Sequence, residues 1–295
     1  PRESCSQFDS LPLTSFLSNT TKTYVVFQTN EGDAPKIVAG LFGGSWLNPK
    51  RGAVAIAWGI NLLLCREFPA LMEYFAASAS ANDTFFAGTS GAGYVYPSIM
   101  PAAAFTRYAQ QVERVSAIYS APPATGAPAD WGVDIWNWGV PEGTLGGEWA
   151  RMIAEYARVA PAVGAFSQQA IGVNATTLCV PIPAAAAAAR AFVPVSFAAR
   201  SLWYPGSPSA PWSRSGQTRA GALDDLERRI RATERRGVTT FSIVYGLVDG
   251  NSGPEGLDAI DAALAMAARL PRERFDIVGA QEFARLSVLH CARST

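Results

Sequence analysis

Carboxylates rather than histidines are the side chains that could transfer protons in this chain. The only histidine among the 295 residues is His290, which stands beside Cys291 near the C-terminus. A Ser-His-Asp or Cys-His nucleophile needs a histidine next to it, and a catalytic zinc site normally needs two or three. Both kinds of site are therefore disfavoured, no metal or cofactor is expected, and pairs of Asp or Glu remain for acid and base work.

Three acidic residues are the candidates for this work. Glu31 and Asp33 stand two apart in "NEGD", so an extended backbone through Gly32 would point both to one face, and Asp249 follows a second strand-like run in "VDGNSG". Two such carboxyls can cleave a glycosidic bond, one protonating the leaving oxygen and the other acting as nucleophile or base. The alternative is that both stretches are plain turns, in which Asn and Asp bond their own backbone.

The elements that must position these residues alternate between apolar strand-like runs and helical patterns. Strands are expected over residues 23–29, 53–59, 84–90, 133–139, 191–197, 239–250 and 274–279, with a further apolar run over 162–169. Helices are expected over 148–160, 223–236, 256–270 and 280–290, with interrupted helical turns over 62–78. Such alternation predicts parallel crossovers, and without a G-x-G-x-x-G turn an open dinucleotide-binding sheet is disfavoured. We expect an α/β protein: a single TIM-barrel-like (β/α) barrel of seven or eight units.

One domain is expected to fill residues 1–295, with an N-terminal extension over 1–22. The stretches 120–132 and 205–221 are rich in Pro, Gly and Ala or Ser and are predicted to be long surface loops inserted in the barrel.

In barrels of this kind the chemistry lies where strands end and loops begin. Glu31 and Asp33 follow the first strand, and we expected Asp249 to approach them from the other side of the mouth. The remaining rim candidates are Trp58, Gly91, Gly93, Tyr94, Tyr96, Trp136, Asn137, Trp138, Ser167, Gln168, Arg200 and Tyr245. The two glycines indicate a sharp turn after the third strand, because glycine accepts positive φ.

The string "GAGYVYP" at residues 91–97 matches the signature of the GxGYxYP family of glycoside hydrolases. Residues 45–64, 69–98 and 274–289 also resemble the C-terminal domain of that family. The resemblance implies a barrel that takes a carbohydrate ligand. The family's first strand ends in a D-G-D-N type of turn, whereas this chain has "EGDA", which keeps the acids Glu31 and Asp33 and replaces the final amide by Ala34.

Together these features favour a glycoside hydrolase that acts on a poly- or oligosaccharide. One alternative is a carbohydrate-binding barrel without turnover, and another is a metal-dependent carbohydrate esterase that uses Glu31 and Asp33 without histidine. We expect Trp58, Tyr94, Tyr96, Asn137 and Trp138 to bind the sugar, since pyranose C–H faces stack on aromatic rings. A Trp at a strand end can instead belong to the core, and one tyrosine can simply brace the loop. Arg200 could bind a uronate or sulfate, although a solvated loop arginine is more common.

The overall composition narrows the partners. Lys and Arg number 24, as do Asp and Glu, so there is no basic surface for nucleic acid, and no apolar run is long enough to cross a membrane. Sequons at Asn19, Asn82 and Asn174 favour the secretory pathway. Four widely spaced cysteines are either buried thiols or up to two disulfides. The oligomeric state is not predicted.

Overall fold

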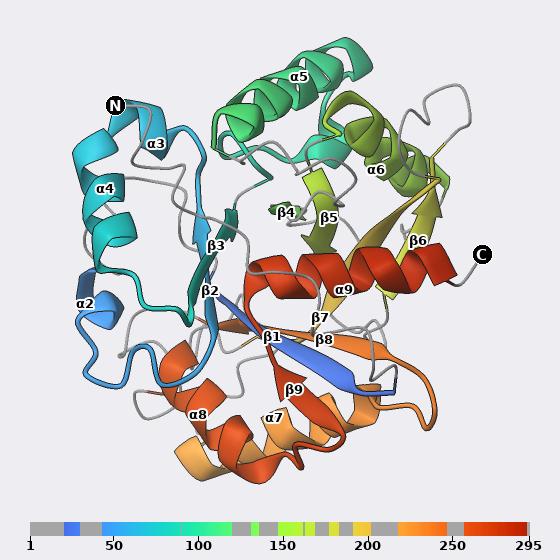
Figure 1. The fold of residues 1–295 in the computed structure, drawn as a ribbon. Coiled ribbons are helices and arrows are strands. Elements are labelled where there is room, and N and C mark those ends of the chain that lie inside the picture. Colours follow the sequence, from blue (N-terminus) through green and yellow to red (C-terminus); the bar gives the residue numbers. More distant parts are fainter. Residues whose placement is uncertain are drawn as a thin grey trace.

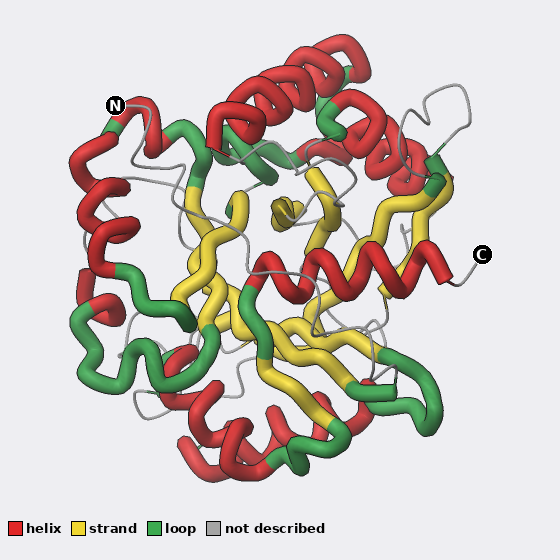
Figure 2. Tube along the Cα trace, viewed as in Figure 1, coloured by secondary structure: helices red, strands yellow, loops and turns green. Residues whose placement is uncertain are grey.

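The computed structural model describes residues 21–29, 43–88, 90–119, 131–135, 147–161, 163–168, 177–182, 191–201, 218–246 and 257–293 (Figures 1 and 2). Its parallel strands are β1 (Thr23–Thr29), β2 (Ile56–Ile60), β3 (Asp83–Ala87), β4 (Trp131–Ile135), β5 (Val163–Gln168), β7 (Phe192–Ser201), β8 (Thr240–Gly246) and β9 (Phe275–Ile277). They pair in the order β2-β3-β4-β5-β7-β8-β1-β9, and β1 also pairs with β2. The sheet therefore curls into a nearly closed barrel of eight strands.

Helices surround this barrel on several sides. They are α2 (Gly43–Trp46), α3 (Leu64–Glu67), α4 (Pro69–Ser78), α5 (Ala102–Tyr119), α6 (Gly147–Val159), α7 (Arg219–Thr233), α8 (Ala259–Arg269) and α9 (Ala280–Arg293), with the 3-10 helix η3 at Pro97–Ile99. In Figure 1, α2 to α4 stand at one side, α5 and α6 at the top, and α7 and α8 at the bottom. Residues 131–132 belong to β4 and 219–221 to α7, so the described ends of both predicted loop insertions are regular structure.

The regular β/α alternation breaks between β5 and β7. There the described chain forms β6 (Thr177–Pro181), a strand that pairs antiparallel with β7, where a complete (β/α) barrel would have a crossover helix. The predicted fold is thus correct in its barrel and its parallel strands, but the sheet is mixed and the unit count is not that of a regular (β/α)8 barrel.

Strands such as β1, β2 and β8 bury both of their faces. On β1 and β8 the side chains of Tyr24, Val26, Phe241 and Ile243 point inward into one apolar cluster. The residues between them face outward and pack against the surrounding helices. This two-sided burial explains why the strands read as continuous apolar runs in the sequence.

Helix α9 closes the end of the barrel from which the strands start. The Ala280 amide at its N-terminus donates to Thr84 Oγ1 near the start of β3 (2.8 Å). The Phe283 ring then packs edge-on against Phe241 inside the barrel, with 5.3 Å between ring centroids. The opposite end, where the strands finish, is here called the mouth.

A disulfide between Cys179 of β6 and Cys291 fixes the far end of α9. Cys65 is a buried free thiol, and Cys5 lies outside the described residues. The sequence had left the state of the cysteines open. Among the described helices, none is long and apolar enough to cross a membrane.

Candidate functional site

A buried carboxylate lies just below the mouth. Asp134 is the penultimate residue of β4, and its neighbours Val133 and Ile135 pack in the outer apolar layer, so alternation turns the Asp134 side chain to the inside of the barrel. Its Oδ1 accepts hydrogen bonds from Ser167 Oγ (2.8 Å) and from the Tyr245 hydroxyl. Asp134 and Tyr245 are fully buried.

These hydrogen bonds cross the interior of the barrel. Ser167 and Tyr245 are the penultimate residues of β5 and β8, and β8 is separated from β4 by at least two strands in either direction around the sheet. Three strands thus contribute polar groups at one level, above the apolar interior formed by residues such as Ile243.

Gln28 adds a fourth polar side chain at this level. Its Cα is in register with that of Tyr245 on the neighbouring strand, and partners across parallel strands share a face of the sheet. Gln28 is 5% exposed, and its Oε1 is buried without a hydrogen-bond partner among the described residues. Such an acceptor costs about 1–3 kcal/mol and calls for an explanation, such as a bound donor. We call Gln28, Asp134, Ser167 and Tyr245 the floor cluster.

The "GAGYVYP" motif forms the loop that follows β3 beside this cluster. The Ser90 amide donates to the Asp134 carbonyl (2.6 Å), and the Ser90 carbonyl accepts from the hydroxyls of Tyr108 on α5 (2.9 Å) and Tyr156 on α6. Burial raises the pKa of both tyrosines well above the ordinary value of 10, so both phenols keep their protons and remain donors. The start of the loop is therefore fixed to β4 and to two helices.

The glycines of the motif serve two different needs. Both have positive φ, 117° at Gly91 and 126° at Gly93, as their presence in a turn predicts. A Cβ on Gly91 would lie 2.7 Å from the Tyr156 hydroxyl oxygen and 2.9 Å from Val112 Cγ2, whereas a Cβ on Gly93 would meet nothing within 4 Å. Gly91 permits close packing and Gly93 supplies only conformation. Whether either glycine contacts a sugar stays a prediction.

The two tyrosines of the motif stand together at the surface. The Tyr94 and Tyr96 hydroxyls are 3.3 Å apart, their rings meet edge-on with centroids 5.8 Å apart, and Tyr94 is 48% exposed. The sequence left open that Tyr94 or Tyr96 only braces the loop. In the structure, Tyr108 and Tyr156 brace it instead. The exposed Tyr94 ring, with the partly buried Tyr96 ring beside it, is therefore an aromatic surface that fits the predicted sugar contact.

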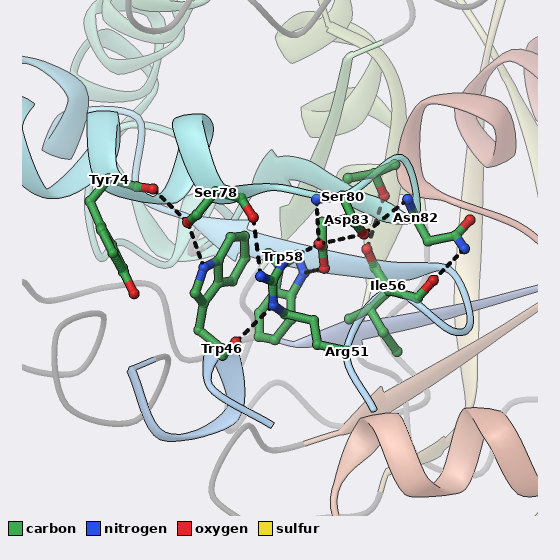
Figure 3. A network of polar contacts seen from close by, with 11 residues as sticks. Trp46, Arg51, Ile56, Trp58, Tyr74, Ser78, Ser80, Asn82 and Asp83 are labelled. Carbon is green, nitrogen blue, oxygen red and sulfur yellow. Dashed lines mark hydrogen bonds and ion pairs between the residues drawn. The ribbon is translucent and has the colours of Figure 1, made fainter. Parts of the chain in front are cut away.

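Trp58 lies elsewhere. It is in the middle of β2, which runs on to Ile60, and alternation places it with Ile56 and Ile60 in the outer layer. The ring is fully buried, its Nε1 donates to Asp83 (2.9 Å), and Trp46 packs edge-on against it (Figure 3). No ring face is left for a sugar, so the predicted binding role of Trp58 does not fit the structure.

Figure 3 shows that Trp58 belongs to a polar clamp at the start of β3. Arg51 pairs with the buried carboxylate of Asp83, donates to the Trp46 carbonyl (2.7 Å) and stacks over the Trp46 ring at 4.2 Å. Ser80 donates its amide and hydroxyl to Asp83 (2.8 and 2.7 Å). Because this carboxylate is matched by a cation and several donors, the clamp is a structural element.

Several predicted site residues fall outside the described residues: Glu31, Asp33, Trp136, Asn137, Trp138 and Asp249. Arg200 lies within β7, with its Cα in register with Val244, and not beyond the strand.

The strand order nevertheless bears on the three predicted acids. β8 pairs with β1 up to their last residues, Gly246 beside Thr29. The segment that leads to Asp249 therefore starts next to the segment that leads to Glu31 and Asp33. The expectation that Asp249 approaches from the other side of the mouth was wrong about its strand, because β8 is the immediate neighbour of β1.

Sequence reasoning missed Asp134 and Gln28. Ser167 and Tyr245 were on the predicted rim, but Asp134 stands inside the strand "WGVDI", ahead of the Trp and Asn residues that drew attention. A single acid within an apolar strand was the signal that could have revealed it, since such a group is costly to bury. Within the described ranges, no three His, Cys, Asp or Glu side chains gather as metal ligands would.

Solved structures with a similar fold include three hydrolase-type proteins. A putative hydrolase from Bacteroides thetaiotaomicron VPI-5482 is 15% identical with a TM-score of 0.69, over 97% of this chain and 49% of that one, so this chain spans about half its length. A putative polysaccharide deacetylase from Mycobacterium smegmatis is 12% identical (TM-score 0.54, 97% and 94% covered). Puue allantoinase is 11% identical (TM-score 0.52, 97% and 96% covered). These likenesses establish the barrel fold.

No curated protein matches this chain at a significant level. The family comparison does give a match, and it covers β1 to β3, the clamp, the "GAGYVYP" loop and nearly all of α5. As the motif predicts, residues 21–118 match the model of the GxGYxYP putative glycoside hydrolase C-terminal domain.

Proposed function

We propose that this chain is a carbohydrate-active hydrolase whose reaction takes place at the mouth of the barrel. The observation that carries the proposal is the Asp134 carboxylate, buried under the mouth and hydrogen-bonded from two other strands. A buried carboxylate is costly, and its position at the carboxyl ends of barrel strands favours a functional role. The family match over residues 21–118 supports a carbohydrate as the ligand.

More specifically, the proposed reaction is hydrolysis of a glycosidic bond in a poly- or oligosaccharide by two carboxyls drawn from Glu31, Asp33 and Asp249. The pairing of β1 with β8 supports this choice, because the segments that carry these acids leave adjacent strand ends. One carboxyl would protonate the leaving oxygen while the other attacks the sugar or activates water. A carboxylate nearby, such as Asp134, would raise the proton affinity of the acid that must stay protonated.

The Tyr94 and Tyr96 pair would supply the sugar contact. Pyranose rings stack their C–H faces on aromatic rings, and the exposed Tyr94 ring is offered beside the Tyr96 ring on a loop anchored to Asp134. This arrangement links a sugar-binding surface to the acid below it through one short stretch of chain.

The test is turnover of a panel of aryl glycosides by single variants. Asp33→Asn, Asp249→Asn and Asp134→Asn should each lower kcat at least about 100-fold, because each removes a proton-transfer group or its support. Asp224→Asn is the matched control, since Asp224 is an exposed acid on α7, and it should keep full activity.

Full turnover in all three variants would refute the carboxylate mechanism. Saturable sugar binding without turnover by the wild-type protein would instead support the alternative, a carbohydrate-binding barrel.

A second candidate is hydrolysis of an acyl group from a polysaccharide. It is favoured by the similar fold of the Mycobacterium smegmatis protein described as a putative polysaccharide deacetylase. Acetate release from acetylated oligosaccharides, assayed with and without added divalent cations and chelator, separates this reaction from glycosidic cleavage, which releases new reducing ends.

We also propose an extracellular or secretory location. The Cys179–Cys291 disulfide supports it, since disulfides persist mainly in oxidising compartments. The sequon at Asn82 gives less support, because the Asn82 amide donates to the Gly52 carbonyl (2.7 Å) and the Thr84 hydroxyl is used within the fold.

A further inference from the structure

We propose that Gln28 is a specificity-determining residue, whose side-chain carbonyl accepts a hydrogen bond from a hydroxyl or amine of a neutral or basic sugar at the mouth. This inference rests on the proposed function and adds the class of sugar to it. It starts from an unusual property of Gln28: the Oε1 atom is buried, and the described residues provide no donor for it.

The other side chains of the floor cluster cannot donate a hydrogen bond to Gln28 Oε1, and they too have acceptor oxygens. A serine or tyrosine hydroxyl has one proton, and those of Ser167 and Tyr245 are both given to Asp134 Oδ1. Their oxygens therefore retain only acceptor capacity, and Asp134 itself is a carboxylate. All four side chains thus present acceptor oxygens at one level of the barrel, where the amide NH2 of Gln28 is the remaining donor group.

The acceptor oxygens of the floor cluster favour ligands that carry hydrogen-bond donors and no negative charge. A neutral sugar hydroxyl or an amino group brings the donor that Gln28 Oε1 lacks, whereas a uronate or a sulfate brings further acceptors and a negative charge next to Asp134. Unmatched acceptors and like charges both disfavour binding. The floor cluster therefore favours neutral or amino sugars over anionic ones. This differs from the sequence-based prediction that Arg200 could bind a uronate or sulfate.

The decisive variant is Gln28→Met, which keeps the length of the side chain and removes the carbonyl. Ser242→Ala is the matched control, because Ser242 Oγ is also buried without a partner among the described residues, on the next strand. Ser242 is in register with Val25 of the outer layer, so it faces away from the floor cluster.

Binding and turnover are measured with aryl glycosides of neutral sugars in both anomers, and with the corresponding glucuronides. The wild-type protein should prefer the neutral sugars. Gln28→Met should weaken their binding about tenfold through KM, with little change in kcat, while its Tm stays equal or rises because an unsatisfied acceptor is gone. Ser242→Ala should bind as the wild type does.

The inference is overturned if Gln28→Met binds as tightly as the wild type, if its Tm falls together with binding, or if the glucuronides bind best. Failure of the wild-type protein to bind or cleave any sugar in the panel would refute the proposed function itself. The two failures are distinguishable, because the first set of outcomes requires a wild-type protein that binds sugar.

Discussion

At the residue scale, two of the buried aspartates in the described part of the chain have contrasting surroundings. Asp83 faces a guanidinium, an indole and a serine at the start of β3, and its contacts hold elements together. Asp134 accepts from two hydroxyls, those of Ser167 and Tyr245, inside the barrel below its mouth. The same residue type thus has a structural role at one end of the molecule and a proposed chemical role at the other.

The two motif glycines give a prediction at this scale. Gly91→Ala should lower the free energy of unfolding by about 2–4 kcal/mol, because it adds a steric clash with Tyr156 and Val112 to the cost of positive φ. Gly93→Ala should cost only about 1 kcal/mol, since it adds conformational strain alone. Urea titration of both variants measures the difference, and equal losses would contradict this account of Gly91.

Glu282 gives a second prediction. Burial raises the pKa of this carboxyl from 4.5 to about 7, with a further rise from Asp276 and an opposing effect of Arg285. Between about pH 4.5 and 7 the folded protein holds a proton that the unfolded chain has released. Stability from this group is therefore present at low pH and is lost as the pH rises through 7.

We expect this loss to be on the order of 1 kcal/mol, below the full linkage value because the carboxyl is partly open to solvent. Glu282→Gln should flatten the dependence of the urea midpoint on pH between 5 and 8. Glu73→Gln, at an exposed position on α4, should leave that dependence unchanged. A Glu282→Gln protein with the wild-type slope would contradict the assignment.

At the scale of elements, α9 is the piece whose placement depends on a covalent bond. Cys179 and Cys291 are separated by 112 positions, and closing a loop of that length stabilises the folded state by about 3–5 kcal/mol in the chain-entropy model. Reduction should therefore lower the Tm of the wild-type protein. The double variant Cys179→Ser, Cys291→Ser should start from the lower Tm and show no response to reductant in a thermal scan.

The elements also show where prediction from sequence succeeded and where it failed. The strand "TYVVFQT" was predicted with its correct bounds, because a run of β-branched and aromatic residues ends at polar turn residues. Helix α5 was overlooked, although Phe105, Ala109 and Val112 recur at helical spacing. Strand β6 was missed because a five-residue segment that ends in a proline gives almost no periodic signal.

At the scale of the whole molecule, the barrel could be predicted, and the layer to which each side chain belongs could not. Alternation tells which residues of a strand share a face, as Trp58 does with Ile60. It does not tell which face is the interior, because β1 and β2 are buried on both sides. For this reason Trp58 was placed at the mouth, while Asp134 and Gln28 were overlooked.

The position of α9 has a consequence for biogenesis. The helix that seals the apolar interior follows all the other described elements in the sequence, so it leaves the ribosome after them, and its cysteine must find a partner made more than a hundred residues earlier. Until then Tyr24 and Phe241 lack the lid supplied by Phe283. The nascent polypeptide would thus expose apolar core residues until α9 has been made, and would depend on chaperones and an oxidising folding environment during that interval.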